Sequence, residues 1–242
     1  MANSPWENKE FARRTISHID EKFLPGTELE VRFLETEMEI DKGAKIIDLG
    51  CGTGRHSIEL GKRGYNLVGV DISEVLIDEG KRRARSTSVD VKFIKGDLRF
   101  LDKLFESKEV KFDGAICLCE SGFGVLGGEE QDINFLKTIY DLLKPKGKFV
   151  LTTFNGIRKY RRYKEKDSVF DYLRGVVHWK TPPGKFREEL TEETRVYTPT
   201  EVRMMFTLSG FSNIKIFGCA PGDFRRQKLN IDDIEMMVLG EK

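Results

Sequence analysis

The residues with the clearest chemical purpose are a glycine-rich loop and an aspartate that follows it. The loop covers residues 50–54, with the sequence GCGTG, and lies between a short apolar run and a stretch with helical spacing. Glycines in such a loop allow backbone N–H groups and a helix N-terminus to approach a ligand closely. Asp71 follows Gly50 by 21 residues and ends the next apolar run. Because a carboxylate there can accept hydrogen bonds from both hydroxyls of a ribose, the two features predict a site for a ribose-containing ligand.

The spacing of the glycines argues against two common nucleotide sites. The dinucleotide fingerprint is G-x-G-x-x-G, whereas Gly50, Gly52 and Gly54 follow G-x-G-x-G, and Arg55 stands where the third glycine should be. A phosphate-binding P-loop ends in G-K-[ST], which is absent here. A purely structural turn between strand and helix is the alternative for the loop alone, and Asp71 favours the ligand.

Alternating apolar and helical stretches must position the loop and Asp71. This alternation predicts βαβ units and a mostly parallel sheet, with strands at residues 45–49, 66–71, 91–94, 112–118 and 148–154. Two later strands are expected at residues 214–218 and 235–240, after a helix that begins at Thr198-Pro199. Residues 155–198 carry short alternations of Val, Tyr, Thr and Trp, which predict a small antiparallel β insertion. Apolar residues on roughly one side predict helices over residues 1–40.

Composition limits the class of protein. The chain has 242 residues, of which 39% are hydrophobic and 33% charged, and this is typical of a folded globular protein. We expect one domain, residues 1–242. The net charge of +1 lacks the basic excess of proteins that coat nucleic acid. No apolar run approaches 18 residues, the N-terminal residues do not resemble a signal peptide, and four cysteines are few, so we expect no membrane partner and a cytoplasmic location.

Five sequence blocks carry a family resemblance. The segment DLGCGTGRHSIELGKRGYNLVGVDIS, residues 48–73, resembles the first motif of the Rossmann-like (class I) S-adenosylmethionine-dependent methyltransferases. The similarity continues, in family order, through residues 95–101, 112–126, 142–155 and 197–211. The chain looks most like the soluble members with small-molecule acceptors, of the glycine and sarcosine N-methyltransferase kind. The resemblance implies a seven-stranded α/β sheet of order 3-2-1-4-5-7-6, with its last strand antiparallel and helices on both faces.

The resemblance also implies a cofactor, S-adenosylmethionine, with S-adenosylhomocysteine as the product, and a role for each matching residue. The loop Gly50, Cys51 and Gly52 would pass under the methionine part. Asp71 would hold the ribose, with Ile72 against the adenine. Asp97 would accept a hydrogen bond from the adenine amino group, with Leu98 on the ring. Leu118 and Cys119 would offer backbone carbonyls to the ammonium group.

The acceptor side is less defined by the sequence. Glu120, which ends the fourth strand, is the candidate for contacting the acceptor, and Phe123 is a candidate for lining its pocket. We expect the insertion and the loop around Asp223 to form the acceptor site, because ligands of open α/β sheets lie beyond the carboxyl ends of the strands. Within the insertion, Arg161 and Arg162 either draw in an anionic acceptor or form a solvated face. In the first case the aromatic residues Tyr172 and Trp179 would cover the acceptor.

Other chemistries receive less support. Cys117 and Cys119 have no second pair at metal-binding spacing, and the three histidines lie far apart, so no metal is expected. The Asp/Asn-Pro-Pro-aromatic pattern of DNA base methylases is absent after the fourth strand, so no DNA partner is expected, whereas RNA and protein acceptors stay open. A non-catalytic protein that binds S-adenosylmethionine is the main alternative to a methyltransferase. The helices of residues 1–40 are expected to act as a lid over the cofactor.

Overall fold

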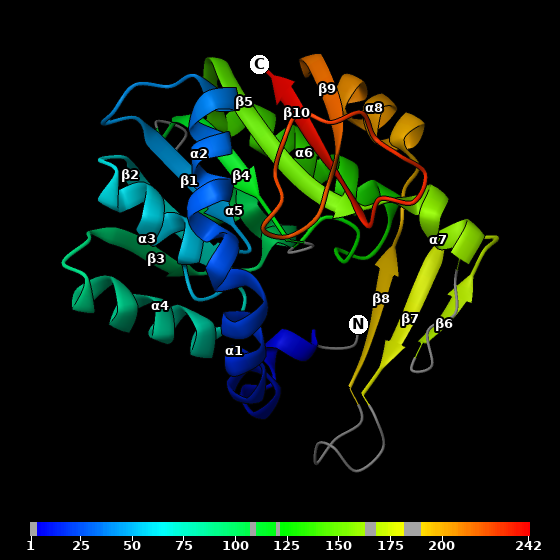
Figure 1. Ribbon diagram of the computed structural model, residues 1–242, viewed down its shortest axis with the longest axis horizontal. Coiled ribbons are helices and arrows are strands. Elements are labelled where there is room, and N and C mark those ends of the chain that lie inside the picture. Colours follow the sequence, from blue (N-terminus) through cyan, green and yellow to red (C-terminus); the bar gives the residue numbers. More distant parts are fainter. Residues whose placement is uncertain (1–3, 107–109, 120–121, 163–167, 182–189) are drawn as a thin grey trace.

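A seven-stranded sheet forms the centre of the fold, with helices on both of its faces (Figure 1). The computed structural model describes residues 4–106, 110–119, 122–162, 168–181 and 190–242. In spatial order the strands are β3 (Val91–Lys95), β2 (Asn66–Asp71), β1 (Lys45–Leu49), β4 (Phe112–Cys117), β5 (Leu143–Phe154), β10 (Glu235–Glu241) and β9 (Ser212–Cys219). β1 to β5 are parallel, and β10 is antiparallel to both of its neighbours. Counted within this sheet, the order is 3-2-1-4-5-7-6, which confirms the prediction.

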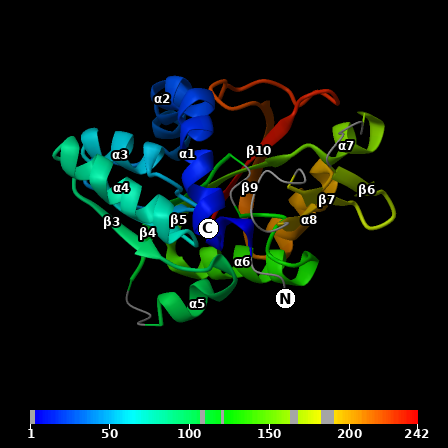
Figure 2. The ribbon, with the colours of Figure 1, turned by 90° about the horizontal axis from the view of Figure 1, so that it is seen from below.

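The helices divide between the two faces of the sheet because the central strands β1, β2 and β4 bury both of their sides. On one face, α2 (Thr27–Met38) and α3 (Arg55–Lys62) pack against the sheet through residues such as Leu34 and Leu60, with α4 (Glu74–Ser86) beside them. On the other face lie α5 (Leu101–Leu104), α6 (Glu129–Leu142) and α8 (Pro199–Leu208), around Phe149 and Phe206. Figure 2 shows these two groups of helices on opposite sides of the strands.

The N-terminal residues are helical, as expected. They form η1 (Pro5–Glu7), α1 (Lys9–Phe23), η2 (Leu24–Gly26) and α2. In Figure 1, α1 extends from α2 past the ends of the central strands and lies beside α4. Arg83 of α4 donates to both carboxylate oxygens of Asp20 at 2.8 and 2.7 Å, which ties α1 to the sheet layer. Among the described residues, no helix is long and apolar enough to span a membrane.

The expected antiparallel insertion is a second, three-stranded sheet. It consists of β6 (Ser168–Asp171), β7 (Val176–Lys180) and β8 (Thr191–Arg195), in the order β6-β7-β8, and it follows the short helix α7 (Gly156–Arg162). In Figure 1 this small sheet projects from the region where β5 ends. β5 ends at the carboxyl edge of the main sheet, so the insertion flanks the edge where open α/β sheets bind ligands.

One strand begins earlier than the sequence indicates. β5 starts at Leu143, before Pro145, and not at Lys148. Leu143 pairs with Phe112, and regular pairing resumes at Lys148 after an irregularity in which Lys146 takes a positive φ of 65°. Helix α6 stops at Leu142, the residue directly before β5. The Pro-Lys-Gly segment therefore bends a strand and does not separate a helix from it.

A buried hydrogen bond links the insertion to the loop that follows β4. Tyr197, just after β8, donates its hydroxyl to Asp132 of α6 at 2.6 Å, and the N–H of Gly124 donates to the same carboxyl at 3.0 Å. Asp132 is completely buried. Burial raises the pKa of Asp132 to about 6, although the hydrogen bonds from Tyr197 and Gly124 oppose that rise.

The raised pKa of Asp132 predicts a particular dependence of stability on pH. An unfolded aspartate has a pKa of about 4, so between pH 4 and pH 6 the folded chain binds more protons at this site than the unfolded chain. The free energy of unfolding therefore falls as pH rises through this window, by about 2–3 kcal/mol from Asp132. We expect Asp132→Asn to flatten the fall measured by urea unfolding at pH 4, 5, 6 and 7. Asp141→Asn, at an exposed site of α6, should leave the slope as in the wild type. An unchanged slope in Asp132→Asn would show that this carboxyl is already ionised at pH 4.

Candidate cofactor site

The glycine loop joins β1 to α3, and the space beside its central residue, Gly52, is not filled by protein atoms. Gly50, Gly52 and Gly54 have φ angles of 71°, 54° and 77°, which a residue with a side chain rarely adopts. A Cβ on Gly54 would lie 2.4 Å from the ring of Phe93, so the end of the loop is closely packed. A Cβ on Gly52 would meet no protein atom within 4 Å. The backbone of Gly52 therefore borders open space that a ligand can enter.

Asp71 lies directly beside this loop. Its carboxylate accepts the N–H of Gly52 at 2.8 Å through one oxygen and the N–H of Ser73 at 2.8 Å through the other. Each oxygen keeps a second lone pair for a ligand hydroxyl. Burial raises the pKa of Asp71 to about 6. The hydroxyl of Ser73 is buried and has no hydrogen-bond partner among the described residues, although Ser73 precedes α4 as its N-cap. An open glycine backbone and an unused hydroxyl beside a buried carboxylate fit the ribose and methionine parts of S-adenosylmethionine.

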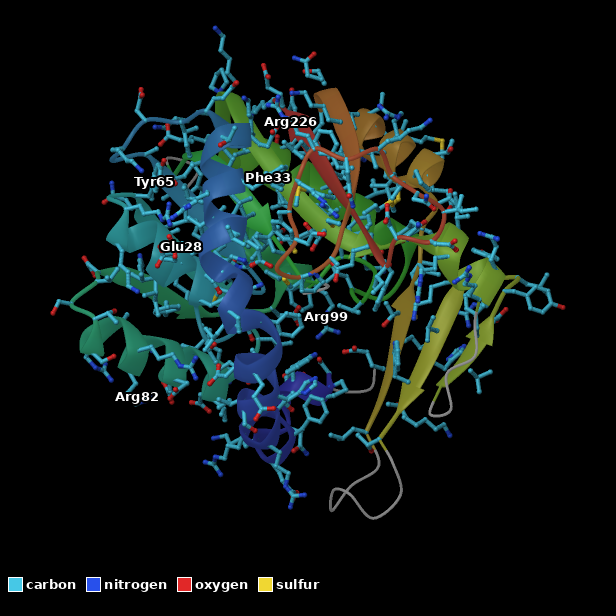
Figure 3. The ribbon with its side chains drawn as sticks, in the orientation of Figure 1. Glu28, Phe33, Tyr65, Arg82, Arg99 and Arg226 are labelled. Atoms are coloured by element: carbon cyan, nitrogen blue, oxygen red, sulfur yellow. The ribbon has the colours of Figure 1, made fainter. Side chains whose placement is uncertain are left out.

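The residues expected around the adenine have partners of their own. Asp97 caps the short helix η3 (Leu98–Phe100) by accepting the N–H of Arg99 at 2.9 Å, and its carboxylate also pairs with the Arg99 side chain. Leu98 is buried. Figure 3 shows Arg99 close to η1, beyond the ends of the central strands. A cofactor amino group would therefore share the Asp97 carboxylate with Arg99.

The chain turns sharply where β4 ends. Leu118 is buried, and Cys119 has a φ of 60° although it is not a glycine. The N–H of Cys119 donates to the hydroxyl of Thr152 on β5 at 2.6 Å. Glu120, the candidate for contacting the acceptor, lies outside the described residues. Phe123 is 3% exposed, and its ring centroid lies 5.1 Å from that of Tyr197, so it packs within the core.

A buried charged cluster next to the glycine loop was not foreseen from the sequence. Glu30 of α2 is fully buried and pairs with the guanidinium of Arg55 and with Nε2 of His56, at 2.8 Å for the histidine. The N–H of Gly222 donates to its other oxygen at 2.6 Å. Burial opposes ionisation, but the hydrogen bond with His56 and the charge of Arg55 together lower the pKa of Glu30 to about 2. Arg55 also places Nη2 2.8 Å from the sulfur of Cys119.

This cluster has the spacing of a metal site, but a side chain supplies its cation. Ligand atoms of Glu30, His56 and Cys119 lie within 4.8 Å of one another. The guanidinium of Arg55 contacts both Glu30 and Cys119. It therefore provides the positive charge that the carboxylate needs. The sequence signal was the pair Arg55-His56 in the first turn after the glycine loop, whereas nothing local marks Glu30 as their partner.

The residues expected at the acceptor site are spread over the surface and the small sheet. Arg161 and Arg162 are about half exposed and pair with Asp232 at 3.3 and 3.1 Å. Tyr172 is 67% exposed in the turn between β6 and β7. Asp223 is exposed and pairs with Arg225 at 2.9 Å. Trp179 is partly buried, and its indole N–H donates to the Thr194 hydroxyl at 3.0 Å.

Comparison with known proteins bears on the family. A family model described as "Methyltransferase domain" matches residues 40–203. The carboxy-S-adenosyl-L-methionine synthase of Nautilia profundicola is 31% identical over 175 residues, which cover 71% of each chain. A ubiquinone biosynthesis O-methyltransferase of Coxiella burnetii is 29% identical over 133 residues, 55% of this chain and 52% of that protein. The first three curated relatives are matched over 42%, 71% and 52% of their length, so the chain spans about half the length of two of them.

Solved structures show the same fold. The CcbJ methyltransferase from Streptomyces caelestis superposes with a TM-score of 0.75 at 19% identity, over 98% of this chain and 97% of that one. An S-adenosylmethionine-dependent methyltransferase from Clostridium acetobutylicum superposes with a TM-score of 0.74 at 17% identity, over 95% of this chain and 98% of that one. The family model covers more than half of the chain and includes the glycine loop, Asp71 and Asp97. The chain therefore belongs to the class I S-adenosylmethionine-dependent methyltransferases, and S-adenosylmethionine is its cofactor.

Proposed function

We propose that the chain transfers the methyl group of S-adenosylmethionine to a small-molecule acceptor. The observation that carries the proposal is the open backbone at Gly52 beside the buried carboxylate of Asp71, at the carboxyl ends of β1 and β2. The cofactor brings a methyl group already activated on a sulfonium. The task of the protein is then to align the acceptor with that carbon and to exclude water. Such a reaction needs a general base only if the acceptor arrives protonated.

We assign the cofactor contacts as follows. Asp71 holds the ribose hydroxyls, and the Gly50, Cys51 and Gly52 backbone lies under the methionine part. Ile72 and Leu98 enclose the adenine. Asp97 accepts a hydrogen bond from the adenine amino group while its ion pair with Arg99 stays in place. The carbonyls of Leu118 and Cys119 face the ammonium group. The helices of residues 1–40 cover the site as a lid, and Glu120 contacts the acceptor.

A small acceptor is supported by the names of the relatives, which refer to carboxy-S-adenosylmethionine and to ubiquinone biosynthesis. The motif resemblance to glycine and sarcosine N-methyltransferases points the same way. The net charge of +1 gives no basic excess for RNA. Incubation with methyl-labelled cofactor and a metabolite library tests the proposal. Transfer of label to a metabolite supports the proposal. Transfer only to RNA or protein would show that the acceptor is a macromolecule, and cofactor binding without any transfer would indicate a non-catalytic binding protein.

Cofactor binding through Asp71 can be measured without an acceptor. Loss of a charge-assisted contact to two hydroxyls costs about 2–3 kcal/mol, or roughly 30–150-fold in affinity. We expect Asp71→Ala to weaken the binding of S-adenosylhomocysteine by this factor, as measured by calorimetric titration. Asp78→Ala, on the exposed face of α4, should bind as the wild type does. If the wild type bound NADH more tightly than S-adenosylhomocysteine, the role given to Asp71 and the identity of the cofactor would both be wrong.

The conformation of Cys119 generates a second prediction. A left-handed backbone costs a residue with a Cβ about 1–2 kcal/mol, and contacts with Thr152 and Arg55 hold Cys119 in it. Cys119→Gly keeps this conformation without strain, whereas Cys119→Ala keeps the strain and loses the sulfur contact. We expect the alanine variant to bind S-adenosylhomocysteine about fivefold or more weakly and the glycine variant to bind close to wild type. Equal losses in both variants would mean that the sulfur itself, and not the backbone conformation, matters for binding.

A further inference from the structure

Glu192 occupies an unusual position in the small sheet. On β8 it lies directly opposite Trp179 of β7, and Thr194 lies opposite Val177. Phe170 of β6 pairs with Val177. Because opposite residues of antiparallel strands share a face, these five residues form one side, here called the inner face. α7 packs against this face through Tyr160, whose ring centroid is 5.0 Å from that of Phe170. An acidic residue therefore stands where the neighbours are mostly apolar.

The adjacent residue Glu193 provides a direct comparison. Its side chain lies on the opposite, solvent-exposed face, where it pairs with His178 at 3.2 Å and with Arg174 at 3.8 Å. Glu192 is partly buried, and none of the side chains that the structure describes forms a hydrogen bond or ion pair with it. Burial alone raises the pKa of Glu192 to about 7. A carboxylate in this setting is destabilised until a cation is placed beside it.

The aromatic residue opposite Glu192 already contacts one cation. The indole N–H of Trp179 is fixed by the Thr194 hydroxyl. The ammonium of the buried residue Lys159 lies 5.2 Å from the Trp179 ring centroid and 4.5 Å from that of Phe154, the last residue of β5. Cations are attracted to the faces of aromatic rings, most strongly to that of tryptophan. The charge of Lys159 does not lower the pKa of Glu192, so this ammonium does not compensate that carboxylate.

We propose that Glu192 and Trp179 bind a cationic ammonium group of the methyl acceptor. The proposal rests on the proposed function, because the occupant is taken to be the acceptor. The inner face includes Trp179, whose ring contacts the ammonium of Lys159, and the same ammonium lies over Phe154 at the carboxyl end of β5. The site is therefore linked through Lys159 to the carboxyl edge of the main sheet, which also carries the cofactor loop. Arg161 and Arg162 do not compete with this assignment, because both are engaged with Asp232 at the surface. The acceptor is therefore a molecule that is held by a quaternary or protonated amine, rather than by a carboxylate or phosphate, and that receives the methyl group at another atom that has a free lone pair.

The chain offers a direct optical test. It contains two tryptophans, so Trp6→Phe leaves Trp179 as the single indole reporter. The probes are choline and its uncharged isostere 3,3-dimethylbutan-1-ol, titrated into this variant while Trp179 fluorescence is recorded. We expect a saturable change with choline and binding of the isostere about tenfold weaker or worse. Propylammonium, tested in parallel, shows whether a protonated primary amine also binds.

Matched variants decide between Glu192 and general electrostatics. Glu192→Gln should weaken the binding of choline about tenfold and leave the binding of the isostere unchanged. Glu193→Gln should change the affinity for neither probe. Equal binding of choline and the isostere, no saturable change, or unchanged choline binding in Glu192→Gln overturns the proposal. S-adenosylhomocysteine is titrated into the same proteins. If S-adenosylhomocysteine binds and choline does not, the proposed ammonium site is wrong and the cofactor site stands. If choline binds and S-adenosylhomocysteine does not, the ammonium site stands and the proposed function is wrong.

Discussion

The buried carboxylate of Glu30 is the interaction on which the arrangement of the site depends. Three groups converge on it: the side chains of Arg55 and His56 at the start of α3 and the backbone N–H of Gly222. Through Arg55 the same cluster reaches Cys119 at the end of β4. An ion removed from water must be paired and hydrogen-bonded, and loss of one partner of a buried pair typically costs about 3–5 kcal/mol. The cluster thus holds α2, the glycine loop, the end of β4 and the loop before β10 in one fixed relation.

The packing around this cluster supports the same relation. A Cβ on Gly26 would lie 2.2 Å from the Cα of Gly222, so the N-terminal segment and the loop between β9 and β10 touch backbone to backbone. Farther along the loop, Arg226 pairs with the buried Glu37 of α2, and Figure 3 shows Arg226 at the top of the molecule close to α2. Phe33 of α2 meets the ring of Phe224 with centroids 6.3 Å apart. α2 is therefore fixed along its length, whereas α1 extends beyond these contacts.

Local sequence patterns were sufficient for the features that depend on neighbouring residues. The glycine loop, the alternation of strands and helices and the start of α8 at Thr198-Pro199 follow from short-range spacing. The order of the strands was implied by the family resemblance, and the sheet has that order. Features that depend on distant partners were not accessible. Glu30 is 25 residues from Arg55 and 192 residues from Gly222, and no periodicity relates them. The early start of β5 likewise depends on a tertiary contact, the pairing of Leu143 with Phe112 of β4, which local signals do not show.

The reversed direction of β10 has a consequence for how the site can vary. Because β9 and β10 are antiparallel, Cys219 and Glu235 face each other at the carboxyl edge of the sheet, and the loop of residues 220–234 both leaves and returns there. The sheet register is set by the pairing from these two residues inward, and Glu235 is held a second time by Phe154. The register of the strands therefore does not depend on the length of this loop, whereas Gly222, Phe224 and Arg226 within the loop are held by α2. A change of loop length would act on these contacts with α2 before it acted on the sheet.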